Sequence, residues 1–294
     1  MRIGGVISVR DEEQLVELNL RYHLDVQGFD TILIIDNGST DNTFRILTEM
    51  NDSRVIIKRT TPETGLAQDV VSTIGTKELF DIYGCDWVIP IDGDEFWVSS
   101  TLGTIRNALE QVPENIDILM TRSYRFYPTV LDDASLDHFL LRLRYAKYES
   151  FGDVEHKVIM RRLSDRLESL PIGNHWANLK KGATAVTADV RIEDISRFHY
   201  RYLDEQSFKK RVISYSKGCI QRFGRDWELG KRSESRRIYE WYVDILDGKF
   251  EEKFRKSFVL DEQYVKTQIS RGEMVYLDDM TRLFPQLESV EMSM

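Results

Sequence analysis

The chain has 294 residues, 41% of them hydrophobic and 30% charged, and its formal net charge is −9. This composition is that of an ordinary globular protein of one large or two small domains, and the acidic charge argues against a surface that grips nucleic acid. No apolar run reaches the roughly 20 residues that would be needed to span a bilayer.

The first hundred residues alternate between short apolar runs and amphipathic stretches. The predicted strands are 3–9, 31–35, 54–58 and 87–91, and the predicted helices are 12–27, a segment around 44–47, and 66–83. Gly28 follows the first helix, where a C-terminal cap is expected. Strands and helices that alternate at this spacing predict βαβ units and therefore a parallel sheet.

Three polar clusters follow predicted strands of this sheet. They are residues 9–12 (Val-Arg-Asp-Glu), 36–39 (Asp-Asn-Gly-Ser) and 92–95 (Asp-Gly-Asp-Glu). In open sheets of this class, ligands bind beyond the carboxyl ends of the strands. The three clusters therefore predict a binding site at one edge of the sheet.

Beyond residue 100 the pattern predicts a helix over 101–112, a strand over 117–123, and then short apolar runs such as 158–160 among loops. From residue 204 the character becomes helical, with amphipathic helices predicted over 205–223 and 233–246. We therefore expect an α/β domain over residues 1–203 and a helical C-terminal extension over residues 204–294.

The acidic motif Asp92-Gly93-Asp94 is delivered by an apolar strand and followed by two aromatic residues. Two carboxylates this close repel each other unless a cation or extensive solvent neutralises them. Carboxylate oxygens suit Mg²⁺ or Mn²⁺, which also bind phosphate oxygens and act as Lewis acids on a departing group. The alternative is an exposed turn after the strand, which the apolar flanks disfavour.

Four segments together carry a resemblance to a known family. They are Val9-Arg10-Asp11-Glu12, residues 34–43, residues 86–96, and the pair His199-Tyr200. Their order and spacing resemble glycosyltransferase family 2, in the branch whose acidic motif continues as Asp-Glu-Phe. The resemblance covers about the first hundred residues well and resumes at the His-Tyr pair.

The resemblance implies a GT-A fold, which is a mixed, mostly parallel α/β sheet flanked by helices. Residues 1–100 would bind a nucleotide sugar, and residues 101–203 would bind the acceptor. The implied activity is hexosyl transfer with inversion, from a nucleotide-diphosphate sugar to a glycan or lipid-linked acceptor. UDP-linked donors are the commonest in the family, and the implied cofactor is Mn²⁺ or Mg²⁺.

The resemblance also assigns roles to individual residues. Asp94 and His199 would bind the metal, and Asp92 would face both the metal and the ribose. For donor binding it implies contacts from Ser8, Arg10, Asp36, Asn37 and Gln68. From the residues themselves we expect Gly93 to let a ligand approach the backbone, and Lys157, which precedes an apolar strand, to reach the diphosphate. The residues alone leave other roles open, namely an Asx turn at Asp36, a buried structural histidine at His199, and an ion pair at Arg10.

Direct displacement requires a general base for the acceptor hydroxyl, and the sequence leaves this base unassigned. The carboxylate candidates are Asp153, Glu155 and Glu193. His175 lies next to Trp176, and an indole face beside an imidazole is typical of an acceptor-sugar site. A structural loop that packs Trp176 inward is the alternative.

The C-terminal extension interleaves basic residues with aromatic ones between positions 208 and 242. Three uses fit this pattern: docking on anionic lipid headgroups, holding a charged acceptor, or a solvated helix surface over aromatic contacts. Nucleic acid is not expected, because acidic residues are interspersed throughout. We expect a cytoplasmic protein with peripheral membrane contact at most, and with Cys85 and Cys219 reduced.

Several other functions compete with this prediction. The chain lacks the glycine motifs of dinucleotide oxidoreductases and of P-loop nucleotidases. Phe96 stands where a phosphatase of the haloacid dehalogenase type has Thr or Val. A nucleotidyltransferase or a retaining sugar transferase remains an alternative, since both use similar sheets and metals. A degenerate, non-catalytic binding or scaffold protein is the non-enzyme alternative.

Overall fold

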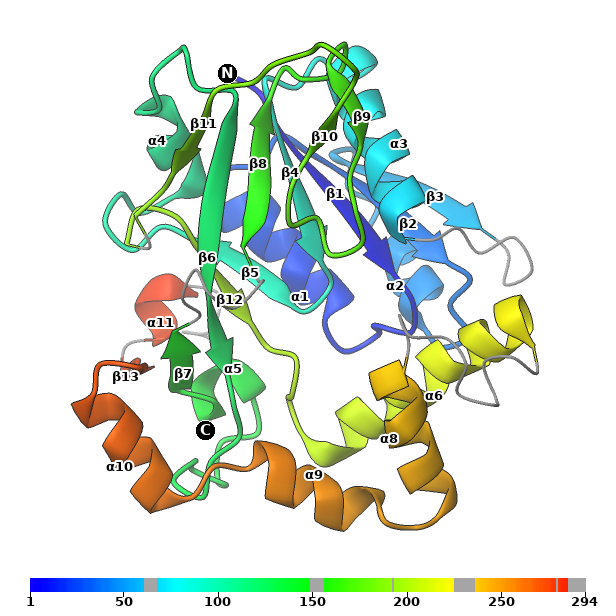
Figure 1. The fold of residues 1–294 in the computed structure, drawn as a ribbon, viewed down its shortest axis with the longest axis vertical. Helices are drawn as coiled ribbons and strands as arrows, with labels where there is room; N and C mark the ends of the chain where they lie inside the picture. Colours follow the sequence, from blue (N-terminus) through cyan, green and yellow to red (C-terminus); the bar gives the residue numbers. More distant parts are fainter. Residues whose placement is uncertain (61–67, 149–155, 192, 225–235, 279, 285–294) are drawn as a thin grey trace.

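A computed structural model describes residues 1–60, 68–148, 156–191, 193–224, 236–278 and 280–284, with a large twisted sheet at its centre (Figure 1). Four parallel strands form one half of the sheet in the order β4-β1-β2-β3. They are β1 (Ile3–Val9), β2 (Thr31–Asn37), β3 (Val55–Thr60) and β4 (Trp87–Asp92). The predicted α/β class, with a mixed, mostly parallel sheet flanked by helices, is confirmed.

Antiparallel strands continue the sheet beyond β4, in the order β8-β6-β7-β13. They are β6 (Ile118–Phe126), β7 (Tyr145–Tyr148), β8 (Lys157–Arg161) and β13 (Met274–Tyr276). Three short strands branch from this half: β5 (Glu95–Val98), β11 (Thr187–Asp189) and β12 (Ser196–His199). A separate two-stranded sheet pairs β9 (Leu167–Ser169) with β10 (Asn178–Leu179).

Helices cover both faces of the parallel half. On one face lie α1 (Val16–Arg21) with its π-helical continuation η1 (Tyr22–Val26), α2 (Thr43–Glu49) and α4 (Ile105–Glu110). The other face carries α3 (Gln68–Asp81), whose apolar residues pack against Val6 and Leu33. Gly75 allows α3 to approach β1 closely, since a Cβ there would lie 2.5 Å from a methyl of Val6. Because both faces are covered, β1, β2 and β4 are almost wholly buried, as their apolar sequences predict, whereas β3 at the edge of the sheet is partly exposed.

The C-terminal extension begins with α6 (Glu205–Phe223), whose bounds match the prediction. It continues with α8 (Arg236–Leu246), α9 (Phe250–Phe258), α10 (Glu262–Ser270) and α11 (Met280–Leu283). Its first three helices share an aromatic cluster built around Phe208, Trp241 and Phe254. The extension is not wholly helical, because β13 returns to the sheet and pairs with β7.

The strands predicted in the first hundred residues are confirmed, with ends within two residues of those observed. The first helix begins at Val16 rather than near residue 12, because Asp11 has a left-handed backbone (φ 54°) and the chain turns there. The sequence did not predict β5 or β12, which are only four residues long. Cys85 and Cys219 are buried and not in a disulfide.

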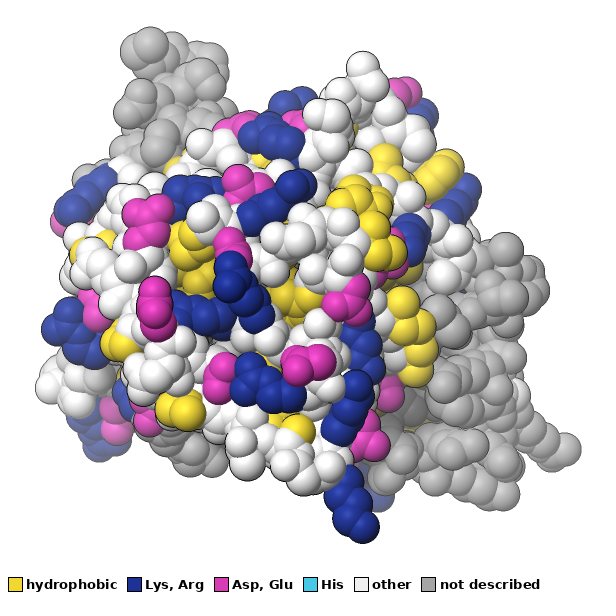
Figure 2. Space-filling view, turned by 90° about the horizontal axis from the view of Figure 1, so that it is seen from above, with side chains coloured by type: hydrophobic (Ala, Val, Ile, Leu, Met, Phe, Trp, Pro, Cys, Tyr) yellow, Lys and Arg dark blue, Asp and Glu magenta, His cyan; other side chains and the backbone are white. Residues whose placement is uncertain are grey.

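The end of the molecule that carries the N-terminus mixes charges of both signs (Figure 2). Arg162 pairs there with Asp86, and Arg106 pairs with Asp30. The electrostatic potentials of such neighbouring opposite charges cancel within a short distance of the surface.

Candidate active site

The carboxyl ends of three parallel strands meet at one edge of the sheet, as the polar clusters predicted. Ser8 of β1 lies opposite Asp92 of β4, and Val9 lies opposite Asp36 of β2. The chain then turns at Gly93 and Asp94 and reverses into β5. Because β5 pairs with β12 so that Glu95 lies opposite His199, the pairing carries this histidine to the acidic motif.

A buried asparagine on α1 holds the turn of the acidic motif. The Nδ2 of Asn19 donates to the carbonyl oxygens of Gly93 (3.2 Å) and Glu95 (2.8 Å). One turn later, His23 Nδ1 lies 2.8 Å from the carbonyl oxygen of Asn19, and its Nε2 accepts a hydrogen bond from the amide of Trp97 (3.2 Å). Burial lowers the pKa of His23 to about 4, which keeps the ring neutral.

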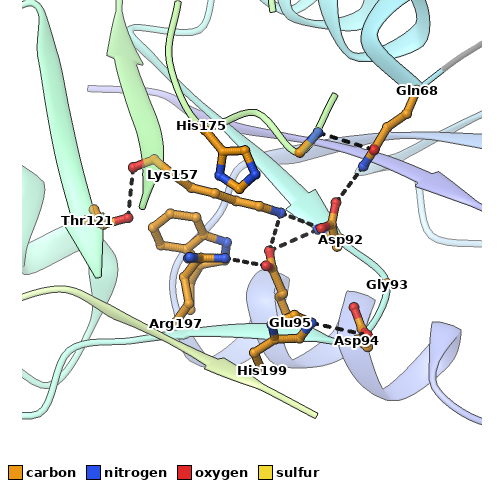
Figure 3. A network of polar contacts seen from close by, with 12 residues as sticks. Gln68, Asp92, Gly93, Asp94, Glu95, Thr121, Lys157, His175, Arg197 and His199 are labelled. Carbon is orange, nitrogen blue, oxygen red and sulfur yellow. Dashed lines mark hydrogen bonds and ion pairs between the residues drawn. The ribbon is translucent and has the colours of Figure 1, made fainter. Parts of the chain in front are cut away.

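Asp92 lies between a lysine and a glutamine (Figure 3). Lys157 Nζ is 2.6 Å from its Oδ2, and Gln68 Nε2 donates to its Oδ1 at 2.8 Å. Gln68 also accepts a hydrogen bond from the amide of Gly173, so it links the acidic motif to that loop. Burial raises the pKa of Asp92, although the charge of Lys157 opposes this. Three predicted donor-binding residues are thus brought together.

Glu95 is wholly buried and accepts from two buried cations. Lys157 Nζ is 2.6 Å from its Oε2, and Arg197 donates to its Oε1. Burial alone would raise the pKa of Glu95, but Arg197 and Lys157 together lower it to about 2. Lys157 is therefore shared between Asp92 and Glu95. Arg197 was missed by the sequence analysis, and a basic residue in the apolar run before His199 was the available signal.

Asp94 contacts two basic side chains. Its Oδ2 lies 2.5 Å from Arg211 Nη1 and 3.4 Å from His199 Nε2. Burial would raise the pKa of Asp94, but Arg211 and His199 hold it well below its usual range. The second amine of Arg211 lies 3.1 Å from Glu12, whose pKa burial raises to about 7 against the charge of the arginine. The sequence analysis placed Arg211 only among the basic residues of the extension.

Among the described residues, no three His, Cys, Asp or Glu side chains converge as a metal-binding group. Asp94 and His199 lie side by side, whereas Asp92 is directed toward Lys157 and Gln68. The expected set of three metal ligands is therefore not assembled. A carboxylate and an imidazole nevertheless fit Mn²⁺, which often has one or two protein carboxylates and takes its remaining ligands from substrate phosphates.

Asp36 is wholly buried and contacts Ser39 and Arg59. Its Oδ1 accepts from the amide of Ser39 (3.0 Å), and its Oδ2 lies 2.8 Å from Arg59 Nε. This is the Asx turn that the sequence left open as the alternative. Asn37 accepts from the hydroxyl of Thr60 at 2.8 Å. Recognition of a nucleobase by Asp36 or Asn37 stays a prediction.

Arg10 points toward an acidic neighbour, with its Nε 4.0 Å from Asp11 Oδ2. Asp11 in turn accepts hydrogen bonds from the amide of Thr40 (2.6 Å) and from the hydroxyl of Ser214. The loop after β1 is thus tied both to the loop after β2 and to α6. Contact of Ser8 or Arg10 with a ribose stays a prediction.

The candidates for the general base lie in different places. His175 lies beside Lys157 in Figure 3, with its Nδ1 2.8 Å from the carbonyl oxygen of His156. Glu193 is exposed and precedes β12 at the end opposite to His199. Asp153 and Glu155 lie outside the described residues. The side chain of Trp176, next to His175, is 46% exposed rather than packed inward.

A cavity of about 250 Å³ lies between α6 and the segment from Asp11 to Leu15. Arg211 lines it, together with the cationic side chains of Arg201, Lys210 and Lys217. It therefore adjoins Asp94 through the guanidinium group of Arg211. No described helix is both long and apolar enough to cross a membrane.

No known protein family and no curated protein matches this chain. Among solved structures, S. aureus TarS 1–349 in complex with UDP aligns with a TM-score of 0.40 and 12% identity, over 100% of this chain and 92% of that one. Mannosyltransferase PcManGT from Pyrobaculum calidifontis, in complex with GDP-Man and Mn²⁺, aligns with a TM-score of 0.44 and 11% identity, over 92% and 79%. At these scores the similarity assigns neither a family nor an activity.

Proposed function

We propose that this chain is a metal-dependent glycosyltransferase that transfers a sugar from a nucleotide-diphosphate donor. One observation carries the proposal. Asp94 and His199 offer a carboxylate and an imidazole side by side, at the sheet edge where the ends of β1, β2 and β4 meet. The preference for UDP-linked donors, for inversion, and for a glycan or lipid-linked acceptor comes from the resemblance to family 2.

The charge balance of the network supports a bound divalent cation. Four carboxylates meet three permanent cations among the described residues: Glu12, Asp92, Asp94 and Glu95 against Lys157, Arg197 and Arg211. Above the pKa of Glu12, which burial raises to about 7, the four carboxylates outnumber the three cations by one, and this negative charge would repel a diphosphate. Added Mn²⁺ would reverse the sign of the site, which favours an anionic donor.

In this proposal Asp94 and His199 would hold the metal, which when bound would supply Lewis-acid stabilisation of a leaving diphosphate. Asp92 stays on Lys157 and Gln68, which fix its position beside the metal ligands. Glu95 does not touch the substrate, because it is wholly buried and holds Lys157 and Arg197 in place.

We propose that His175, which the sequence predicted at the acceptor-sugar site, is the general base. Its Nδ1 faces the carbonyl oxygen of His156 and must therefore carry the proton, so that Nε2 has the free electron pair that a base requires. Its ring lies beside Lys157 (Figure 3). The exposed face of Trp176 next to it would stack on the acceptor sugar.

The experiment combines the purified chain with a panel of nucleotide sugars, with and without Mn²⁺. One donor is expected to raise the thermal stability only when metal is present, by about 2.7 kcal/mol at one hundred times its dissociation constant. Nucleoside diphosphate release should follow, and Asp94→Asn should abolish both effects. Asp133→Asn is the matched control, because Asp133 is exposed and its carboxylate bonds to the neighbouring Ser135.

Each product distinguishes one of the alternatives. Release of pyrophosphate would indicate a nucleotidyltransferase, and a retained anomeric configuration would indicate a retaining transferase. A folded protein that shows neither stabilisation nor product with any donor would contradict the proposal and favour a non-catalytic binding protein.

A further inference from the structure

Arg211 and a metal ion would compete for the same oxygen atom. Arg211 Nη1 lies 2.5 Å from Asp94 Oδ2, and that oxygen also faces His199 Nε2 at 3.4 Å. A metal held between the aspartate and the histidine would therefore bind where the guanidinium group now donates. Two cations on one oxygen repel strongly in a partly buried site. Arginine does not escape this repulsion by losing its proton, so the side chain must move away when the metal binds.

The structure provides space for this movement. Arg211 lines the cavity of about 250 Å³ between α6 and the segment that begins at Asp11. The α6 residues one turn to either side form hydrogen bonds with that segment, Ser207 with Gln14 and Ser214 with Asp11. These contacts hold α6 against the segment while the guanidinium group itself borders the cavity.

A new partner for the displaced guanidinium group would arrive with the donor. A diphosphate offers pairs of oxygen atoms that match the planar fork of an arginine, and such bidentate contacts are among the strongest in proteins. Glu12, which binds the second amine at 3.1 Å, would keep the side chain near the site while it changes partner.

We propose that Arg211 is a gate that couples metal binding to donor binding. Without a donor it occupies Asp94 and weakens the binding of metal alone. When metal and nucleotide arrive together, it moves from Asp94 to the diphosphate and strengthens the complex. The second half of this inference depends on the proposed function, since it requires a diphosphate ligand at this site.

The test measures dissociation constants by titration calorimetry for Mn²⁺ alone, and for UDP, GDP and pyrophosphate in the presence of Mn²⁺. Pyrophosphate is included because it does not depend on the nucleobase. Arg211→Gln is expected to bind Mn²⁺ alone about tenfold more tightly than the wild type, and the diphosphates about tenfold more weakly. These changes of opposite sign distinguish a gate from a residue that only maintains the fold.

Lys209→Gln is the matched control, because it removes the same charge from a position two residues earlier in α6, where the lysine pairs with Glu251 on α9. Both of its dissociation constants should stay within about twofold of the wild type. Arg211→Lys keeps the positive charge. It is the second variant, to be used if Arg211→Gln does not fold. Its compact ammonium group competes with Mn²⁺ but binds diphosphate less well, so only the second constant should weaken.

The outcomes separate this inference from the proposed function. If the wild type binds diphosphates with Mn²⁺ and the Arg211 variants match it for both ligands, the gate is overturned and the proposed function stands. If Arg211→Gln weakens the binding of Mn²⁺ alone, the gate is also overturned, because the arginine then supports the metal site. If the wild type binds no diphosphate with Mn²⁺, the proposed function fails and the second half of this inference fails with it.

Discussion

Lys157 and Glu95 form an ion pair, with Nζ 2.6 Å from Oε2, in which each side chain is only 1% exposed. The same ammonium group lies 2.6 Å from Asp92 Oδ2. One buried lysine therefore joins a residue of the acidic motif to a carboxylate that no ligand can reach. Its role in holding the site is open to direct measurement.

Lys157→Met removes the charge but keeps most of the side-chain volume. Glu95 and Asp92 then lose a positive charge that balances their negative charges. Breaking such a buried ion pair should lower the free energy of unfolding by about 3 kcal/mol. Urea denaturation measures this change. Lys58→Met is the matched control, because Lys58 pairs with Glu78 while 46% exposed; its cost should be about 0.5 kcal/mol or less. Equal costs for both variants would contradict the structural role.

His23 predicts how stability depends on pH. Its folded pKa of about 4 lies below the usual value of 6.5, so the unfolded chain takes up a proton first as the pH falls. The group's contribution is therefore fully present above pH 6.5 and lost between pH 6.5 and 4, by about 3 kcal/mol. Urea denaturation at several pH values measures this slope. The control variant His138→Asn, which removes a different histidine, should keep the slope. His23→Asn should flatten it, and an unchanged slope in that variant would exclude His23 as the cause.

Asn19 should affect ligand binding although its side chain bonds to the backbone of the acidic motif and not to Asp92 or Asp94 themselves. Asn19→Ala removes both hydrogen bonds that hold the turn at Gly93 and leaves two buried carbonyl oxygens without this donor. We expect a loss of about 2 kcal/mol in stability and at least a tenfold weaker affinity for the metal–nucleotide complex. Asn107→Ala, which removes one exposed hydrogen bond to Leu102, should change neither. Unaltered affinity in Asn19→Ala would show that the turn at Gly93 keeps its conformation without the side chain of Asn19.

Gly173 and Gly182 form a matched pair for testing His175. Both have left-handed backbones, with φ of 82° and 83°, so an alanine at either position costs about 1 kcal/mol of backbone strain. A Cβ at Gly173 would lie 2.3 Å from His175 Nε2, whereas nothing lies within 4 Å at Gly182.

Gly173→Ala should therefore displace the imidazole and reduce turnover of the donor identified above by about tenfold to a hundredfold. Gly182→Ala should stay close to the wild type, although its loss of stability is similar. Turnover and thermal stability, measured together, separate the two effects. Equal turnover in both variants would remove His175 from the reaction.

Local patterns predicted the parallel half of the fold because each strand there is a continuous apolar run ended by a turn. They also predicted that the clusters at residues 9–12, 36–39 and 92–95 would meet, since parallel strands place their carboxyl ends at one edge. These expectations required no knowledge of distant contacts.

The partners of the acidic residues were harder to predict. Arg211 reaches Asp94 from 117 positions away, and Arg197 reaches Glu95 from 102 positions away. Both contacts depend on how the antiparallel half and α6 fold back, which no local pattern specifies. Asn19 and His23 left a weak local signal, because two polar residues four positions apart accompany the apolar side of a helix. Asn19 and His23 were not predicted as site residues, because that side of the helix was interpreted as apolar core alone.

The return of β13 to the sheet has a consequence for the order in which the protein matures. β13 lies far behind β7 in the chain, yet it covers the outer edge of β7, and Phe284 packs against Tyr22 with ring centroids 4.6 Å apart. Until β13 has been made and has paired, β7 therefore presents unpaired backbone groups that invite pairing with other chains. A chain that ends at residue 203 would keep this open edge permanently, so shortening the protein to its α/β part should favour aggregation.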